Sequence, residues 1–139
     1  MEPNKELLGP ISQQSLIHEL FEKIKREQYL SDEILRELNV LFQITAAGAL
    51  EILDNNKAIK LVASPSERYL YAVNASNKSK VKTYYTCIPP SYCSCVAFLY
   101  GIKKKEFYCK HLLAVQLLEA LGSAQTEDIS DTDFALKIQ

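Results

Sequence analysis

The sequence predicts an α+β fold in which N-terminal helices pack with a small antiparallel sheet and a C-terminal metal-binding segment of strand, loop and helix. Three observations favour this fold class. Apolar residues recur at helical spacing before residue 56, they alternate at strand spacing between residues 58 and 87, and three of the four cysteines lie between residues 93 and 109. A chain of 139 residues with 47% hydrophobic and 24% charged residues suits a single domain over residues 1–139.

Residues 10–56 are expected to form the helical half of the domain. The first helix follows Ser12 or Ser15 as its N-cap, and its apolar positions are Leu16, Ile17, Leu20, Phe21 and Ile24. The second helix begins at Ser31, because a serine followed by two acidic residues caps a helix and complements its dipole. A third helix ends at the asparagine pair 55–56, since asparagine tolerates the left-handed backbone that closes a helix.

Residues 57–87 are expected to form three antiparallel strands, over 58–63, 68–73 and 81–87. Pro65 supplies the fixed φ of the turn between the first two strands. Cys87 lies at the end of the third strand, where a buried thiol is expected, and it is the natural substitute if a nearby metal site needs another ligand.

Cys93, Cys95, Cys109 and His111 make two close pairs of metal-ligand residues separated by a loop. Three thiolates and an imidazole suit tetrahedral Zn2+, and four protein ligands leave no open position for water. The pattern therefore predicts one structural zinc and argues against zinc-dependent hydrolysis. Two alternatives stay open, namely four unrelated buried or capping side chains, and redox chemistry of the Cys93–Cys95 pair.

These residues resemble the SWIM zinc finger, in which a short strand pair and a helix share one zinc. The segment YTC…YCSC…F…CKHLLAV is also similar to the small SWIM subunit of the Shu complex, although Val96 stands where many SWIM members have proline. The resemblance places the finger at residues 88–122. It implies a nuclear, non-enzymatic accessory subunit in homologous recombination and DNA repair. Such a subunit forms a heterodimer with a RecA-like recombinase paralogue and promotes recombinase filament assembly or stability on single-stranded DNA.

The last strongly apolar segment, residues 112–121, is expected to be a core helix that ends at Gly122. Alternatively, Leu118 and Leu121 on one side of it remain uncovered and bind the partner. The acidic tail at residues 123–139 either holds a turn of helix near 131–136 or is a flexible linear motif, and in both cases Phe134 and Leu136 are candidate partner contacts.

The charge is unevenly distributed along the chain. The overall net charge is −1, yet residues 57–110 hold ten Lys/Arg against two Asp/Glu, and the segments on both sides are acidic. The candidate phosphate contacts in this basic segment are Lys82, Lys103, Lys104, Lys105 and Lys110. Tyr84, Phe107 and Tyr108 offer rings on which unpaired bases of single-stranded DNA could stack. The alternative is that these lysines only form solvated loops.

Composition and motifs also limit the class of protein. The N-terminus lacks the features of a secretion signal, so we expect the nucleus or the cytoplasm, where thiols stay reduced. No phosphate-binding glycine loop and no H-E-x-x-H motif is present, so an enzyme is not expected. The remaining alternative to the recombination subunit is a zinc-stabilised protein-interaction adaptor that does not bind nucleic acid.

Overall fold

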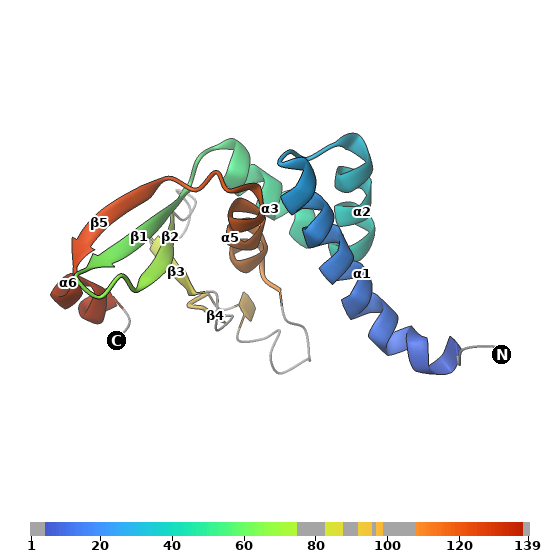
Figure 1. The fold of residues 1–139 in the computed structure, drawn as a ribbon, viewed down its shortest axis with the longest axis horizontal. Coiled ribbons are helices and arrows are strands. Elements are labelled where there is room, and N and C mark those ends of the chain that lie inside the picture. Colours follow the sequence, from blue (N-terminus) through green and yellow to red (C-terminus); the bar gives the residue numbers. More distant parts are fainter. Residues whose placement is uncertain (1–4, 75–82, 88–91, 96, 99–107, 138–139) are drawn as a thin grey trace.

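The computed structural model describes residues 5–74, 83–87, 92–95, 97–98 and 108–137, with side chains from residue 15 onward. It confirms the α+β class: the first two helices lie at one end, a five-stranded sheet lies towards the other, and the third helix lies between them beside a helix from nearer the C-terminus (Figure 1). In this part of the chain, no helix has both the length and the apolar character needed to cross a bilayer.

The helical half consists of α1 (Lys5–Glu27), α2 (Asp32–Phe42) and α3 (Ile44–Asp54). Ser31 caps α2 as expected, because its hydroxyl accepts a hydrogen bond of 3.2 Å from the amide of Ile34. The expected start of the first helix at Ser12 or Ser15 is wrong. The helix begins at Lys5, since residues 5–8 are strong helix formers and the helix continues through Pro10 despite its missing amide donor.

The sheet contains β1 (Ala58–Ser64), β2 (Tyr69–Asn74), β3 (Thr83–Cys87), β4 (Tyr92–Cys93) and β5 (Thr126–Ser130), in the order β4-β3-β2-β1-β5. The first three strands form the expected antiparallel array, and β4 extends it by pairing antiparallel with β3. β5 differs, because it pairs with β1 in parallel and makes the sheet mixed. Most of its residues are exposed and two are acidic, so its sequence lacked the alternating apolar pattern that identifies a strand.

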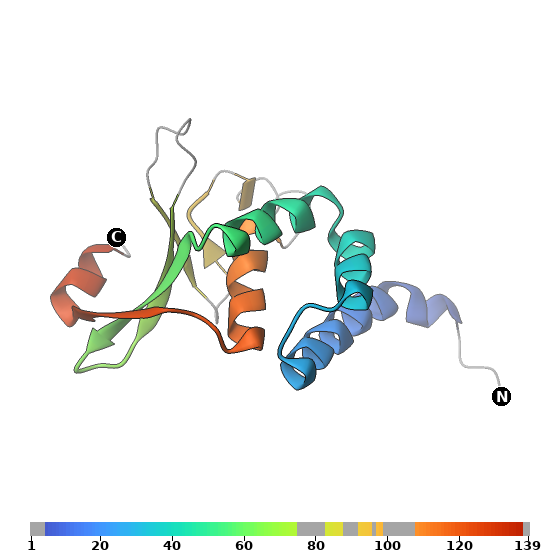
Figure 2. The ribbon, with the colours of Figure 1, turned by 90° about the horizontal axis from the view of Figure 1, so that it is seen from above.

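Helix α5 (Lys110–Leu121) lies at the centre of the molecule, between the sheet on one side and α1 and α2 on the other, with α3 running beside it (Figure 2). Its expected end is confirmed, because Gly122 adopts the left-handed backbone with φ of 65°. Seven of its residues are buried, and all of these except His111 lie in a core that also includes Leu20, Leu38 and Tyr71. This core joins α1, α2, α3 and α5 to one face of the sheet, so α5 is a core helix over most of its surface.

The opposite face of the sheet is covered by α6 (Asp131–Lys137), which follows β5 directly. Phe134 of α6 packs with Leu61, Ala63 and Leu70 in a second, smaller core. The acidic tail is therefore ordered in this structure between residues 126 and 137. Phe134 is only 5% exposed, so the structure places this candidate partner contact inside the protein, whereas Leu136 is 62% exposed.

Candidate metal centre

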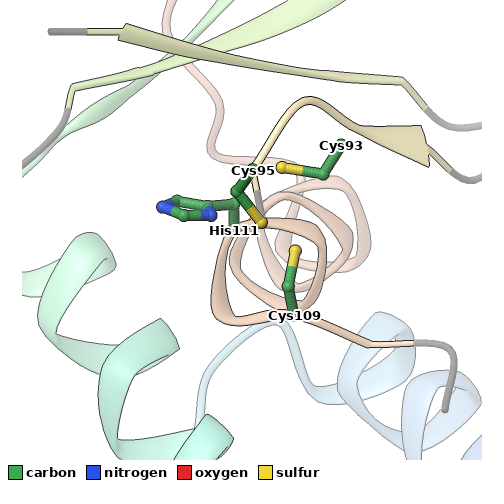
Figure 3. Close-up of side chains that lie close together, drawn as sticks. All are labelled: Cys93, Cys95, Cys109 and His111. Carbon is green, nitrogen blue, oxygen red and sulfur yellow. The ribbon is translucent and has the colours of Figure 1, made fainter. Parts of the chain in front are cut away.

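The two pairs of predicted ligands come from different elements that meet beside the first turn of α5. Cys93 ends β4, Cys95 lies two residues further on, Cys109 is the N-cap of α5, and His111 lies in its first turn. All four side chains are buried, and their ligand atoms lie within 4.8 Å of one another. Figure 3 shows the three sulfur atoms directed towards a common space next to the His111 ring.

The tight Cys93-Ser94-Cys95 turn is held against β3 by hydrogen bonds of Ser94. The amide of Ser94 donates to the carbonyl of Tyr85 at 3.0 Å, and the Ser94 hydroxyl accepts from the amide of Tyr85, also at 3.0 Å. Ser94, the small residue between the two cysteines, thus provides hydrogen-bond partners for both the amide and the carbonyl of Tyr85 in the neighbouring strand. This arrangement directs both thiols of the turn towards α5.

Each of the three sulfur atoms accepts one hydrogen bond from the surrounding protein. Cys95 accepts from the amide of Phe98 at 3.3 Å, Cys109 accepts from the amide of Leu112 at 3.3 Å, and Cys93 accepts from the hydroxyl of Thr86 at 3.4 Å. Hydrogen bonds to the ligands are typical of metal sites, where they orient the ligand atoms and stabilise their charge.

The imidazole supplies independent evidence for an ion. Among the described residues, Nδ1 of His111 is the one buried side-chain nitrogen or oxygen without a hydrogen-bond partner. A buried polar atom left unpaired costs about 1–3 kcal/mol, so native structures rarely contain one. Coordination of a metal ion by Nδ1 would use this lone pair.

The thiols cannot all ionise side by side without a cation. Hydrogen bonds with Cys109 and Cys93 hold the pKa of Cys95 far below that of an ordinary thiol. The contacts of Cys109 with Cys93 and Cys95, together with burial, raise the pKa of Cys109. A divalent cation among the sulfurs would stabilise all three thiolates together, as metal binding to cysteine requires.

The donor set and the geometry fit one structural zinc. A zinc tetrahedron with metal–sulfur distances of about 2.3 Å has edges of about 3.8 Å, so no two ligand atoms need to approach each other by more than about 1 Å. Four protein ligands close the coordination shell, and burial separates the site from bulk water. Cys87 is not part of this cluster, because its side chain packs on the opposite face of the sheet.

The other candidate site residues are distributed differently. Lys110 is exposed between two of the ligands, whereas Lys82, Lys103, Lys104 and Lys105 lie outside the described residues. On α5, Leu121 packs against the main core and Leu118 is half-buried.

Two of the rings considered for base stacking have neighbours within the protein. The Tyr84 ring centroid lies 4.5 Å from that of His111, and the Tyr108 ring packs edge-on against Phe42 with centroids 4.9 Å apart. Phe107 lies outside the described residues. The structure therefore gives Tyr84 and Tyr108 packing roles at the metal centre and the helical core.

The sequence pattern did not reveal the contacts that β3 makes with the ligands. Thr86 and Tyr84 lie two residues apart and so share one face of the strand, which is the face turned towards the site. Strand periodicity could have placed both residues on one face, but only the fold shows that this face meets the cysteines.

No family model matches the chain, and no solved structure matches it. Among curated proteins, the human protein named "Zinc finger SWIM domain-containing protein 7" is 36% identical over 125 residues, covering 88% of this chain and 86% of the human protein. The mouse protein of the same name is 35% identical over 121 residues, covering 85% of this chain and 76% of the mouse protein. The Dictyostelium discoideum homolog is 31% identical over 111 residues, covering 78% of this chain and 69% of that protein. With its Cys3His centre built as a SWIM finger requires, the chain belongs to the family of zinc finger SWIM domain-containing protein 7.

Proposed function

We propose that this protein is a non-enzymatic accessory subunit in homologous recombination and DNA repair, with a structural zinc that supports its partner-binding surface. Its partner is a RecA-like recombinase paralogue, bound as a heterodimer in the nucleus. Together they promote the assembly or stability of recombinase filaments on single-stranded DNA.

The observation that carries this proposal is the similarity to relatives that bear the SWIM name over most of the chain, including the metal centre. The closed, buried ligand set supports a structural rather than a catalytic ion. The resemblance of the finger to the small SWIM subunit of the Shu complex supplies the pathway and the class of partner.

Purification from its native cells tests the partner directly. The tagged protein is isolated under mild conditions, and companions present in a 1:1 ratio are identified by mass spectrometry. We expect a RecA-like ATPase paralogue, and we expect chelation of zinc to release it because the finger and the core share buried residues. A stoichiometric companion of another class would refute the recombination role.

Nucleic-acid binding is tested with labelled single-stranded DNA and the purified heterodimer at several salt concentrations. Changing Lys103, Lys104 and Lys105 to glutamate should weaken binding and reduce the slope of log K against log salt by about 2, because each lost phosphate contact contributes about 0.7. The matched control changes three cationic residues of the helical half, Lys25, Arg26 and Arg36, to glutamate, with the same change in net charge and no expected effect. A complex insensitive to salt and to both triple changes would instead support an adaptor that does not contact DNA.

A further inference from the structure

The side chain of Thr86 has an unusual environment for a threonine. It lies on β3 directly opposite Cys93 of β4, and it is 0% exposed. Valine has nearly the same shape, and a buried hydroxyl costs free energy unless it forms a hydrogen bond. The hydroxyl at this position therefore needs a partner.

That partner is a ligand atom of the metal centre. The Thr86 hydroxyl donates to Sγ of Cys93 at 3.4 Å, and both residues are fully buried. Sulfur is a weak acceptor as a thiol and a stronger one as a thiolate, because hydrogen bonds to charged groups are shorter and stronger. The contact is thus best suited to a cysteine that is bound to a metal.

The same face of β3 also contacts the second ligand pair. Tyr84 lies two residues before Thr86, and its ring packs against the imidazole of His111 with centroids 4.5 Å apart and ring planes at 37°. One strand therefore touches Cys93 from the first ligand pair and His111 from the second. Figure 3 shows these two ligands approaching the site from different elements, β4 and α5.

We propose that β3 is the element that aligns the two halves of the metal centre, with Thr86 as the principal positioning residue. Its hydroxyl fixes the Cys93 sulfur and offsets part of the thiolate charge. The Tyr84 ring restricts the orientation of the His111 imidazole. Neither residue binds the ion, so both act through the ligands that they contact.

The test compares single substitutions in the full-length protein. Thr86→Val removes the hydroxyl and keeps the shape of the side chain, and Thr86→Ser keeps the hydroxyl and removes a methyl group. Thr83→Val is the matched control, because the same exchange is made on the same strand at a position whose side chain lies on the opposite face. Zinc affinity is measured by competition with a coloured chelator, and the geometry of the sulfur ligands is followed by the charge-transfer absorption of the Co2+-substituted protein.

We expect Thr86→Val to weaken zinc binding by about 10-fold to 100-fold, as is usual when a hydrogen bond to a metal ligand is removed, and to shift the Co2+ absorption. Thr86→Ser should keep affinity and spectrum near those of the wild type, and Thr83→Val should change neither. Wild-type affinity and spectrum in Thr86→Val would overturn the proposal. So would equal losses in Thr86→Val and Thr86→Ser, because packing rather than the hydroxyl would then explain the effect.

A measurement on the unmodified protein covers the case in which Thr86→Val does not fold. After exchange of zinc for 113Cd, the buried Thr86 hydroxyl proton should exchange slowly with solvent. It should also show scalar coupling to the metal through the Cys93 sulfur. A rapidly exchanging, uncoupled hydroxyl proton would refute the assignment.

Discussion

Cys109 combines two functions that substitution can separate. Its sulfur is one of the four ligand atoms, and the same sulfur caps α5 by accepting a hydrogen bond from the amide of Leu112 at 3.3 Å. Serine is among the best N-cap residues, and Ser31 makes the equivalent bond to the amide of Ile34 at 3.2 Å in α2. Cys109→Ser therefore removes the thiolate but keeps a cap, whereas Cys109→Ala removes both.

The two losses differ in size. A structural zinc contributes on the order of 10 kcal/mol to folding, which is comparable to the whole stability of a domain. A side-chain N-cap contributes about 1 kcal/mol, or about a fivefold change in the folding equilibrium. With zinc present, both variants should be strongly destabilised relative to the wild type. Without zinc, Cys109→Ser should be more stable than Cys109→Ala by about 1 kcal/mol.

The assay is urea unfolding followed by circular dichroism, with bound zinc measured in parallel. The zinc-free comparison is made in trimethylamine N-oxide, which favours the compact state and keeps the weakened chains folded in the absence of denaturant. Wild-type zinc affinity in Cys109→Ser would show that Cys109 is not a ligand. Equal stability of the two zinc-free variants would show that the sulfur contributes nothing as a cap.

Three further predictions concern the core, a helix end and the remaining thiol. Glu119→Ala should lower the free energy of unfolding by about 1–3 kcal/mol, because it leaves the hydroxyl of buried Tyr71 without its acceptor. A double-mutant cycle with Tyr71→Phe measures this coupling in urea, and additive losses would contradict it. Ser31→Ala should cost about 1 kcal/mol by the same assay through loss of the α2 cap, and an unchanged midpoint would argue against that cap. Burial raises the pKa of the Cys87 thiol, so its reactive thiolate is scarce at neutral pH. Iodoacetamide should therefore modify one cysteine per zinc-loaded chain, and this reaction should be slower than that of a free thiol and should accelerate as the pH rises. After zinc is removed by a chelator, all four cysteines should react. Mass spectrometry distinguishes these cases, and rapid modification of several cysteines in the zinc-loaded protein would contradict the site.

The ligand set could be predicted from the sequence because its chemistry is local. Cys93 and Cys95 are separated by one residue, as are Cys109 and His111, and few other patterns place thiols and an imidazole so close together. The capping of α2 by Ser31 and the end of α5 at Gly122 were also predictable, since each depends on backbone geometry at one position. The contact of Thr86 with Cys93 was not, because it depends on the register of two paired strands.

The mixed sheet illustrates the limit of local patterns. The sequence of β5, TEDIS, contains acidic residues that disfavour strands, and its extended conformation results from pairing with β1, a segment distant in the sequence. The amide of Lys60 donates to the carbonyl of Gln125 at 2.8 Å, and Ile129 packs against the second core. Such non-local pairing compensates for low intrinsic propensity. The sequence offered two alternatives for this tail, and a helix near residues 131–136 is the one that the structure contains.

The parallel pairing of β5 with β1 has a consequence for biosynthesis. β1 emerges from the ribosome well before β5 does. Until the intervening residues have been translated, α6 cannot cover the apolar side chains of Leu61, Ala63 and Leu70. The zinc ligands are complete by residue 111, and the nascent chain can therefore acquire its ion before its sheet is finished. A premature stop codon after α5 would leave a metal-bound polypeptide in which this apolar face of the sheet is exposed to solvent. Such a polypeptide would be recognised by chaperones and degraded by proteases.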